Sequence, residues 1–139
     1  MRILGIDYGD ARTGLAICDT AGFLATPIGT IHEWNFTQLV EKITAQIVAN
    51  KADEIVIGYP KNMNGTIGER AEKSQKFALL LEKATGIPVK LWDERCTTMS
   101  AHVFMNATDT RGKKRKETVD AAAATIILQD YLDFLRNKL

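Results

Sequence analysis

Residues 2–18 carry the clearest pattern in the chain: Arg2-Ile3-Leu4-Gly5-Ile6-Asp7-Tyr8-Gly9-Asp10-Ala11-Arg12-Thr13-Gly14-Leu15-Ala16-Ile17-Cys18. Two apolar segments of strand length flank a short turn that contains glycine, which predicts two buried strands joined as a hairpin. Asp7 closes the first strand. Desolvating a carboxylate costs free energy, so an acid here is typical of catalysis or metal binding, with an ordinary turn aspartate as the alternative interpretation.

The composition describes a mid-sized protein with balanced charge. The chain has 139 residues, of which 45% are hydrophobic, and this length predicts a single domain over residues 1–139 with a sizeable core. The 18 Lys and Arg against 17 Asp and Glu give a net charge of +1. A polyanionic partner would therefore have to be held by a local basic cluster rather than by the overall field.

Other sequence features favour a cytoplasmic protein without a membrane partner. The N-terminus lacks the pattern of a signal peptide, and no apolar segment approaches the roughly 20 residues that span a bilayer. Cys18 and Cys96 lie far apart and show no C-x-x-C spacing. Free, buried thiols in a reducing compartment are therefore favoured over a disulfide or a zinc site.

The order of apolar segments predicts an α/β fold. Five segments have the length and character of strands: Ile3–Ile6, Leu15–Cys18, Ile28–Ile31, Glu54–Gly58 and Val89–Trp92. Short turns join the first three, which predicts antiparallel pairing, whereas a helix-length segment separates the last two and requires a parallel crossover. The sheet should therefore be mixed. Pro27 favours an edge position for the third strand, because proline cannot donate to a central ladder.

Helical patterns lie between and after these strands. Residues 35–50 place Phe36, Leu39, Val40, Ile43 and Ile47 at helical spacing. A second helix is expected to begin at the capping-box pattern Thr66-Ile67-Gly68-Glu69 and to end at Gly86, and a third should cover Met99–Met105. The polar, basic segment Asn106–Lys116 predicts a mobile loop before a last helix over Glu117–Leu135.

Further carboxylates lie at the ends of two predicted elements. Asp93 and Glu94 follow the last strand, and only one of them can share the face of Asp7 because side chains alternate along a strand. Asp120 lies in the first turn of the last helix. It shares a face with Ala124, Ile127, Tyr131 and Phe134, the stripe that we expect to pack on the sheet. Strand-end solvation and stabilisation of a helix dipole are the simpler explanations for these acids.

Acids in such positions could together hold hard divalent cations. Mg²⁺ prefers oxygen ligands and keeps several waters, so two or three carboxylates and substrate phosphate oxygens suffice. Two such ions roughly 3.5 to 4 Å apart can support phosphodiester cleavage. The sequence alone does not bring the acids together in space.

Four motifs occur in order along the chain: Gly5–Gly9 with Arg12–Gly14, Val56–Pro60 with Gly65-Thr66, Trp92–Arg95 with Thr97-Thr98, and Lys113–Lys116 leading to Val119-Asp120 and Ile127–Gln129. Over essentially the whole chain they resemble the bacterial YqgF/RuvX family of pre-16S rRNA nucleases, also described as Holliday-junction-resolvase-like. The resemblance implies an RNase H-like fold with a mixed five-stranded sheet flanked by helices. It also implies that Asp7, Glu94 and Asp120 are the catalytic and metal-binding acids, for Mg²⁺ or Mn²⁺ in a two-metal site, and it selects Glu94 over Asp93.

The chain departs from the family pattern at a few positions. Cys96 stands where leucine is expected, and His102 where glutamate is common. Position 123 is alanine, where RuvC-type resolvases carry a second acid in the final helix. Three acids in place of four favour general nuclease chemistry over the resolution of DNA junctions.

Basic residues near the predicted acids are candidates for contacts with nucleic-acid phosphates, which supply affinity without sequence information. They are Arg12, Lys61, Arg70, Arg95, Arg111, Lys113, Lys114, Arg115 and Lys116. The last five precede Asp120 and would overhang the acid site, although a solvated surface loop is the alternative. The expected partner is structured RNA, such as pre-rRNA or the pre-ribosome, or branched DNA.

The leading hypothesis is a metal-dependent endonuclease that matures the 5′ end of pre-16S rRNA. The alternatives are a Holliday junction resolvase and a non-catalytic module that binds RNA or the ribosome. Ile6-Asp7-Tyr8-Gly9 also looks like a phosphate loop of actin-like ATPases, but those proteins need two lobes, and this chain is too short for them. For the oligomeric state, we expect a monomer or a weak homodimer.

Overall fold

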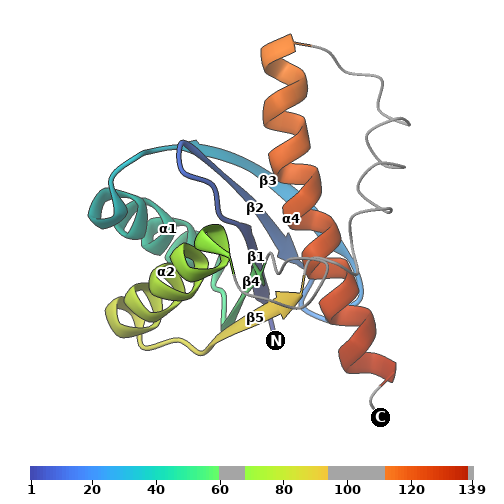
Figure 1. Cartoon of the computed structure of the whole chain (residues 1–139). Helices are drawn as coiled ribbons and strands as arrows, with labels where there is room; N and C mark the ends of the chain where they lie inside the picture. Colours follow the sequence, from blue (N-terminus) through green and yellow to red (C-terminus); the bar gives the residue numbers. More distant parts are fainter. Residues whose placement is uncertain (60–67, 94–111, 138–139) are drawn as a thin grey trace.

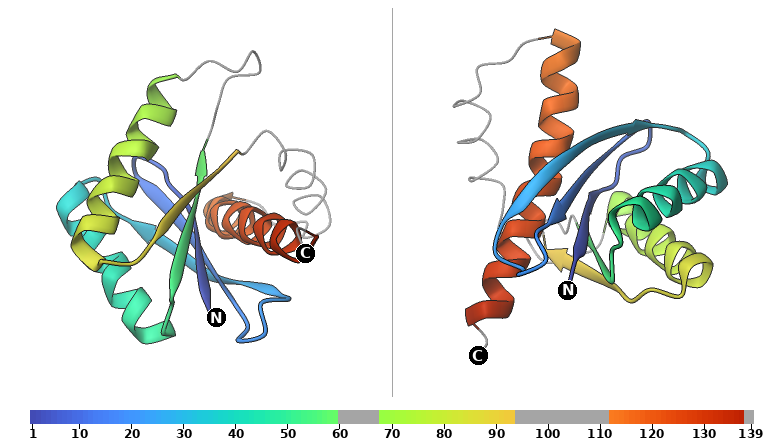
Figure 2. Two further views of the ribbon diagram at one scale, coloured as in Figure 1. Left: turned by 90° about the horizontal axis from the view of Figure 1, so that it is seen from below. Right: turned by 180° about the vertical axis from the view of Figure 1, so that it is seen from behind.

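A five-stranded sheet forms the centre of the molecule in the computed structural model, which describes residues 1–59, 68–93 and 112–137. The strands are β1 (Ile3–Asp7), β2 (Arg12–Cys18), β3 (Ala25–His32), β4 (Glu54–Tyr59) and β5 (Val89–Asp93), and the helices are α1 (Phe36–Asn50), α2 (Glu69–Thr85) and α4 (Gly112–Asn137). Helices α1 and α2 cover one face of the sheet and α4 covers the other (Figures 1 and 2).

The pairing of the strands confirms the predicted mixed sheet. The strand order is β3-β2-β1-β4-β5. β2 is antiparallel to both β1 and β3, whereas β4 is parallel to both β1 and β5. Each predicted strand is present. β2 is longer than predicted because it begins at Arg12 rather than Leu15, and its buried polar residue Thr13 is 0% exposed.

Strand β3 lies at the edge of the sheet, as Pro27 predicted. Its pairing with β2 is irregular: Leu15 pairs with Gly29 and Ala16 pairs with Pro27, so Ile28 is an inserted residue. Gly29 has φ +152°, a backbone conformation that residues with a side chain rarely adopt. The edge strand therefore carries a bulge.

The alternation of side chains along β1 divides the core into two layers. Leu4, Ile6 and Tyr8 belong to the cluster under α1 and α2, whereas Ile3 belongs to the cluster under α4. Both layers are apolar and nearly closed to water, and full burial of a large apolar side chain contributes about 1.5–3 kcal/mol. The odd-numbered positions of β1, which include Asp7, thus face the side of the sheet that α4 covers.

The ends of α1 and α2 test the predicted helix signals. Asn35 caps α1, where its side chain accepts a hydrogen bond from the Gln38 amide at 3.1 Å. Gly86 ends α2 as predicted, in a left-handed conformation with φ 71°. The predicted capping box is wrong, because the N-cap of α2 is Gly68, which has no side chain to cap with, and Glu69 is the first helical residue. Thr66 lies outside the described residues.

Helix α4 begins earlier than the sequence predicted. It starts at Gly112, so Lys113–Lys116 are helical rather than part of a loop. Lysine and arginine are good helix formers, but without apolar residues they give no amphipathic period. The expected helix Met99–Met105 and the remainder of the predicted loop lie outside the described residues. Within the described ranges, no helix combines the length and apolar character needed to cross a membrane.

The apolar stripe of α4 packs on the sheet over most of its length. Ala124, Ile127 and Tyr131 are buried, as predicted. Phe134 is an exception, because its side chain is 47% exposed and lies at the margin, where its ring contacts that of Trp92 with a centroid distance of 5.4 Å. The helix extends past the end of the sheet at which β1 terminates (Figure 1).

Candidate active site

Asp7 lies at the carboxyl end of the central strand β1, where it pairs with Gly14 of β2. Its side chain is half-buried, between the closed core and the solvent. In open α/β sheets ligands bind at the carboxyl ends of strands. The structure therefore places this acid at the position where the fold class commonly carries chemistry.

A tight turn after Asp7 holds the end of β1 in place. A Cβ added at Gly9 would lie 2.3 Å from the Arg12 carbonyl oxygen, so no other residue fits without moving the backbone. The buried Thr13 hydroxyl spans the turn, since it donates to the Gly9 carbonyl at 3.4 Å and lies 3.5 Å from the Gly9 amide as its acceptor. Gly9 and Thr13 thus restrict the backbone on which Asp7 sits.

Helix α4 approaches β1 closely and runs antiparallel to it. Tyr131 of α4 bonds to Glu54, which pairs with Ile3 at the start of β1. Farther along β1, Gly5 faces Ala124 and Leu128. Two more strand residues advance about 6.6 Å, and one more helical turn covers about 5.4 Å. The backbone at position 120 therefore lies near the level of Asp7 on the same side of the sheet.

A cleft opens beside this end of β1, on the side of α1 and α2. Its volume is about 300 Å³. Among the described residues, its lining comes from the turn after β1, from the β3–α1 connection and from α1 and α2: Tyr8, Asp10, Trp34, Phe36 and Lys73. Burial, followed by the negative charge of Asp10, raises the pKa of Tyr8 above its usual value. This side chain therefore stays neutral at physiological pH and acts as an apolar and hydrogen-bonding surface.

The other predicted site residues are only partly described. Glu94, Lys61, Arg95 and Arg111 lie outside the described residues, and so do Cys96 and His102. Asp120 lies in the third turn of α4 rather than in the first turn as predicted, because the helix begins at Gly112. The basic positions 113–116 lie in the first two turns of α4, and Arg70 lies in the first turn of α2. Arg12 is half-buried at the start of β2, opposite His32 of β3.

The chemistry of the donor set fits a hard cation at Asp7, although one carboxylate alone does not form a metal centre. Among the side chains that the structure describes, no group of three His, Cys, Asp or Glu could hold a metal ion. Of the three predicted ligands, only the Asp7 side chain is among them. Cys18, in contrast, is a buried free thiol, as predicted, and its sulfur accepts a hydrogen bond from the Ile3 amide at 3.1 Å.

Sequence reasoning missed the residues of the cleft. Trp34 and Lys73 are 39 positions apart, and no spacing rule connects them. The available signal was Trp34 itself, a large aromatic residue in the polar context His32-Glu33-Trp34-Asn35. A tryptophan in a turn, outside any apolar period, is a candidate for a surface contact.

Comparisons with known proteins agree over nearly the whole chain. A family model described as "RuvX: Holliday junction resolvase" matches residues 1–134. A Geobacillus protein is 47% identical over 139 residues, which span 96% of this chain and 98% of that protein. A Bacillus subtilis protein is 45% identical over 141 residues, with 97% and 99% coverage. Both are named "Putative pre-16S rRNA nuclease".

Solved structures match at the level of the fold. Thermus thermophilus RuvC in complex with a Holliday junction aligns with a TM-score of 0.63 at 12% identity, covering 99% of this chain and 96% of that one. The fowlpox virus resolvase with Holliday junction DNA aligns with a TM-score of 0.60 at 14% identity, covering 97% and 99%. These neighbours and the observed sheet confirm the expected RNase H-like fold.

Proposed function

Since the chain belongs to the RuvX family, we propose that it is a metal-dependent endonuclease whose substrate is the precursor of 16S rRNA. Support for nuclease chemistry comes from relatives that carry that name at 45–47% identity over nearly the full length. The observation that carries the proposal is the position of Asp7, a half-buried carboxylate at the end of the central strand and on the side that α4 covers.

We assign Asp7, Glu94 and Asp120 as the acids of one cation site. The register of α4 on β1 supports Asp120, because it brings position 120 to the side and level of Asp7. Trp92 supports Glu94 over Asp93, since Trp92 packs in the α4 layer and strand alternation favours position 94 for the same side. Two Mg²⁺ or Mn²⁺ ions would supply Lewis acidity and a water of lowered pKa.

The residues of the chain would have separate roles in this reaction. The three carboxylates would hold the ions and orient the scissile phosphate between β1 and α4. Basic positions 113–116 lie in the first two turns of α4, and no acid accompanies them in the first turn. Cations and the helix dipole there both favour a polyanion, so these positions would bind the nucleic-acid backbone.

Replacing Asp7 by asparagine tests the cation site. The change keeps the size of the side chain but removes its charge, so we expect cleavage of precursor 16S rRNA to fall at least ~100-fold, because even outer partners of metal ligands typically cost 10–100-fold. Nucleic-acid affinity in chelator and the thermal midpoint should stay near wild type. The measurement is the single-turnover cleavage rate with Mg²⁺, with Mn²⁺ and with chelator.

Asp19→Asn is a matched control for this test. Asp19 lies beyond the other end of β2, where its side chain accepts hydrogen bonds from the amides of Phe23 and Leu24. Asparagine retains an acceptor oxygen, so this variant should cleave like wild type. Wild-type cleavage by Asp7→Asn would refute the assignment, and cleavage that is unchanged by chelator would refute the metal dependence.

Branched DNA is the second candidate substrate, because the matching family model is described as a Holliday junction resolvase and the fold resembles resolvases solved with junction DNA. Ala123 argues against it, as the position where RuvC-type resolvases carry a further acid. A four-way DNA junction in the same assay decides between the two. Faster cleavage of the junction than of precursor rRNA would reverse our preference.

A further inference from the structure

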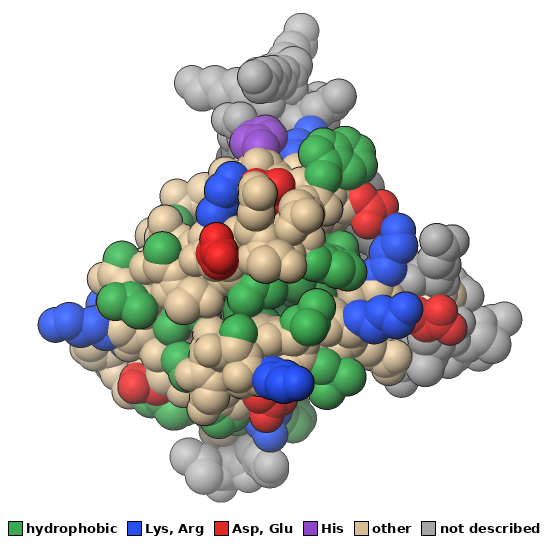
Figure 3. Space-filling model, turned by 90° about the vertical axis from the view of Figure 1, so that its left-hand side faces the viewer, with side chains coloured by type: hydrophobic (Ala, Val, Ile, Leu, Met, Phe, Trp, Pro, Cys, Tyr) green, Lys and Arg blue, Asp and Glu red, His purple; other side chains and the backbone are tan. Residues whose placement is uncertain are grey.

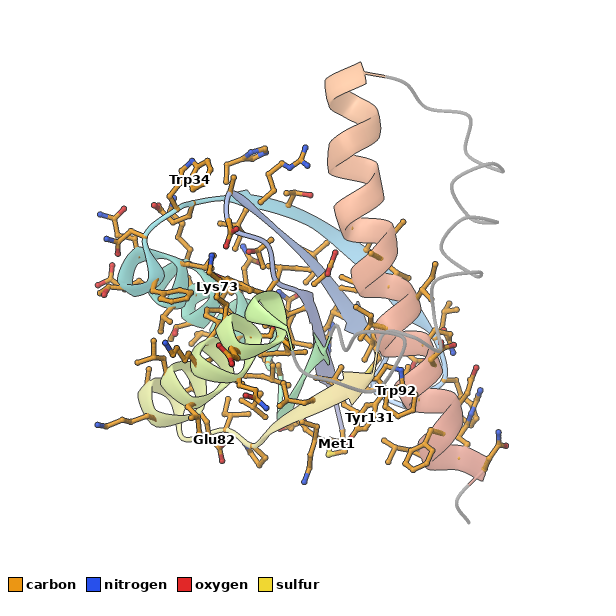
Figure 4. The ribbon with its side chains drawn as sticks, in the orientation of Figure 1. Met1, Trp34, Lys73, Glu82, Trp92 and Tyr131 are labelled. Carbon is orange, nitrogen blue, oxygen red and sulfur yellow. The ribbon has the colours of Figure 1, made fainter. Side chains whose placement is uncertain are left out.

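Trp34 is the most exposed large hydrophobic side chain among the described residues. It is 78% exposed and lies two residues after the end of β3, at the rim of the cleft beside the end of β1. Trp34 and Lys73 lie on the same side of the molecule, from the β3–α1 connection and from α2 (Figure 4). Neither residue has a role in the chemistry proposed for Asp7.

The floor of the cleft is aromatic and well packed. Tyr8 is 7% exposed and stacks on Phe77 with a centroid distance of 4.9 Å, and its ring lies 5.7 Å from that of Phe36. Packed rings hold one another in place, so the floor is formed before any ligand arrives. Trp34 lies at the edge of this floor, and most of its side chain is exposed to solvent.

The charged groups at the rim leave a cation accessible to a ligand. The ammonium of Lys73 lies 3.3 Å from a carboxylate oxygen of Asp10, and both side chains are substantially exposed, at 40% and 60%. Exposed ion pairs of this kind are weak, so a phosphate can replace the carboxylate at Lys73. Glu33, which precedes Trp34 in the chain, pairs with Lys42 at 2.8 Å.

The surface view shows which kinds of side chain gather on this side of the molecule. Figure 3 looks onto the side of α1 and α2, and at its upper rim histidine, basic, acidic and hydrophobic side chains lie next to one another. In the strand register, Arg12 and His32 are opposite one another at the same end of the sheet. Among the described residues that line the cleft, Lys73 is the basic one and Asp10 the acidic one.

We propose that this cleft binds one unpaired nucleotide of the nucleic-acid substrate, with its base stacked on Trp34 and a phosphate at Lys73. A volume of about 300 Å³ suits a single nucleoside, at the lower end of the range for small-ligand sites. Proteins recognise unpaired bases by stacking them on exposed aromatic rings, whereas a duplex hides those faces. The inference rests on the proposed function, because the cleft opens at the same end of β1 as Asp7, on the opposite face of the sheet.

Trp34→Ala tests the stacking. The assay is the affinity for a fluorescently labelled single-stranded RNA octamer and for a blunt RNA duplex, both measured in chelator. We expect the variant to bind the octamer ~5- to 100-fold more weakly, the range for loss of one base–aromatic stack, and to bind the duplex like wild type. Trp34→Phe keeps an aromatic face and should restore most of the octamer affinity.

Phe23→Ala is the matched control. Phe23 is also an exposed aromatic residue, at 55%, but it precedes β3 whereas Trp34 follows that strand, so the two lie beyond opposite ends of β3. This control should bind both RNAs like wild type. Equal losses for octamer and duplex in Trp34→Ala, an equal loss in Phe23→Ala, or no octamer binding by wild type would each overturn the proposal.

Tryptophan fluorescence gives a second measurement. The chain has two tryptophans, and Trp92 is only half-exposed and packs against Tyr131 at a centroid distance of 5.8 Å. Octamer binding should therefore quench wild type and leave Trp34→Phe nearly unchanged. Asp7→Asn separates the two proposals, because it should lose cleavage but keep this quenching. If the RNA octamer quenched the fluorescence of the wild-type protein but the wild-type protein cleaved no RNA, the nuclease proposal would be refuted and the nucleotide-binding proposal would stand.

Discussion

Tyr131 fastens α4 to the sheet through a hydrogen bond between two buried side chains. Its hydroxyl donates to a carboxylate oxygen of Glu54 at 2.7 Å, and the two residues are 7% and 9% exposed. Burial, and then the hydrogen bond and negative charge of Glu54, raise the pKa of Tyr131 far above its usual value. The phenol therefore keeps its proton, and Glu54 keeps its partner, throughout the physiological range.

Tyr131→Phe should lower the free energy of unfolding by about 1–3 kcal/mol at pH 8, because a buried carboxylate loses a hydrogen-bond donor. The raised pKa also gives a pH dependence. The tyrosine of the unfolded chain ionises near pH 10 while the folded one stays protonated, so wild-type stability declines as the pH rises above about 10. Urea unfolding at pH 8 and pH 10.5 should show the gap between wild type and variant narrowing. A constant gap would contradict this explanation.

At the scale of elements, the contact between β1 and α4 depends on the absence of a side chain at Gly5. A Cβ at this position would lie 2.7 Å from the Leu128 Cβ and 3.0 Å from the Ala124 carbonyl oxygen. Both distances are too short, and one involves the backbone of α4. The helix can lie this close to the central strand only while position 5 is glycine.

Gly5→Ala should therefore destabilise the protein by about 1–3 kcal/mol, the usual cost of overpacking a core. It should also reduce cleavage, because α4 would move away from the end of β1. Urea unfolding measures the first effect. Leu128→Gly in the same background removes the Cβ that lies 2.7 Å from the added methyl group, so the double variant should be more stable than the sum of the two single losses predicts. If the losses of the two single variants were strictly additive, contact with Leu128 would not be the cause of the destabilisation by Gly5→Ala.

The sequence predicted the strands and α1 to within a few residues because apolar periodicity and turn residues determine them. The sequence-based prediction was wrong at the starts of β2 and α4, where a side-chain hydrogen bond and intrinsic helix propensity determine the boundary. Thr13 is polar yet buried, because it bonds to Gly9 across the turn, so β2 appeared shorter than it is. Lys113–Lys116 are helical through intrinsic propensity, without the apolar stripe that would reveal a helix.

The positions of the candidate site residues were predictable in part for the same reasons. Asp7 is evident from its place at the end of an apolar strand, since the strand and its acid are adjacent in sequence. The cleft is different, because Tyr8, Trp34 and Lys73 come from three separate segments and only the packed fold brings them together. A single sequence does not show which of these separate segments lie close together in the folded protein.

At the scale of the whole molecule, the net charge of +1 gives little general attraction for RNA. The positions of the basic residues therefore matter more for RNA binding than their number. Lys113, Lys114, Arg115 and Lys116 lie at the end of α4 that extends past the sheet (Figure 1). We infer that this end of the helix carries most of the affinity for the phosphate backbone.

Changing these four residues to glutamine leaves 14 basic against 17 acidic residues, so the net charge falls from +1 to −3. We expect weaker binding of single-stranded and duplex RNA alike, and a smaller slope of log affinity against log salt, by about one for each lost phosphate contact. Glutamine at Lys51, Lys76, Lys83 and Lys90 makes the same change of charge away from this end of α4, after α1, on α2 and near the start of β5. If the control set weakens RNA binding by the same amount, the net charge of the protein determines the affinity and the N-terminal end of α4 has no special role.

The irregular edge strand β3 makes one free edge of the sheet a poor starting point for aggregation. An exposed strand can serve as a template on which a strand of another chain adds, which is the first step of many aggregates. In β3, Pro27 has no amide hydrogen to offer and the inserted Ile28 breaks the register. An incoming strand would find no regular ladder to extend, so β3 can complete its own sheet without recruiting a neighbour.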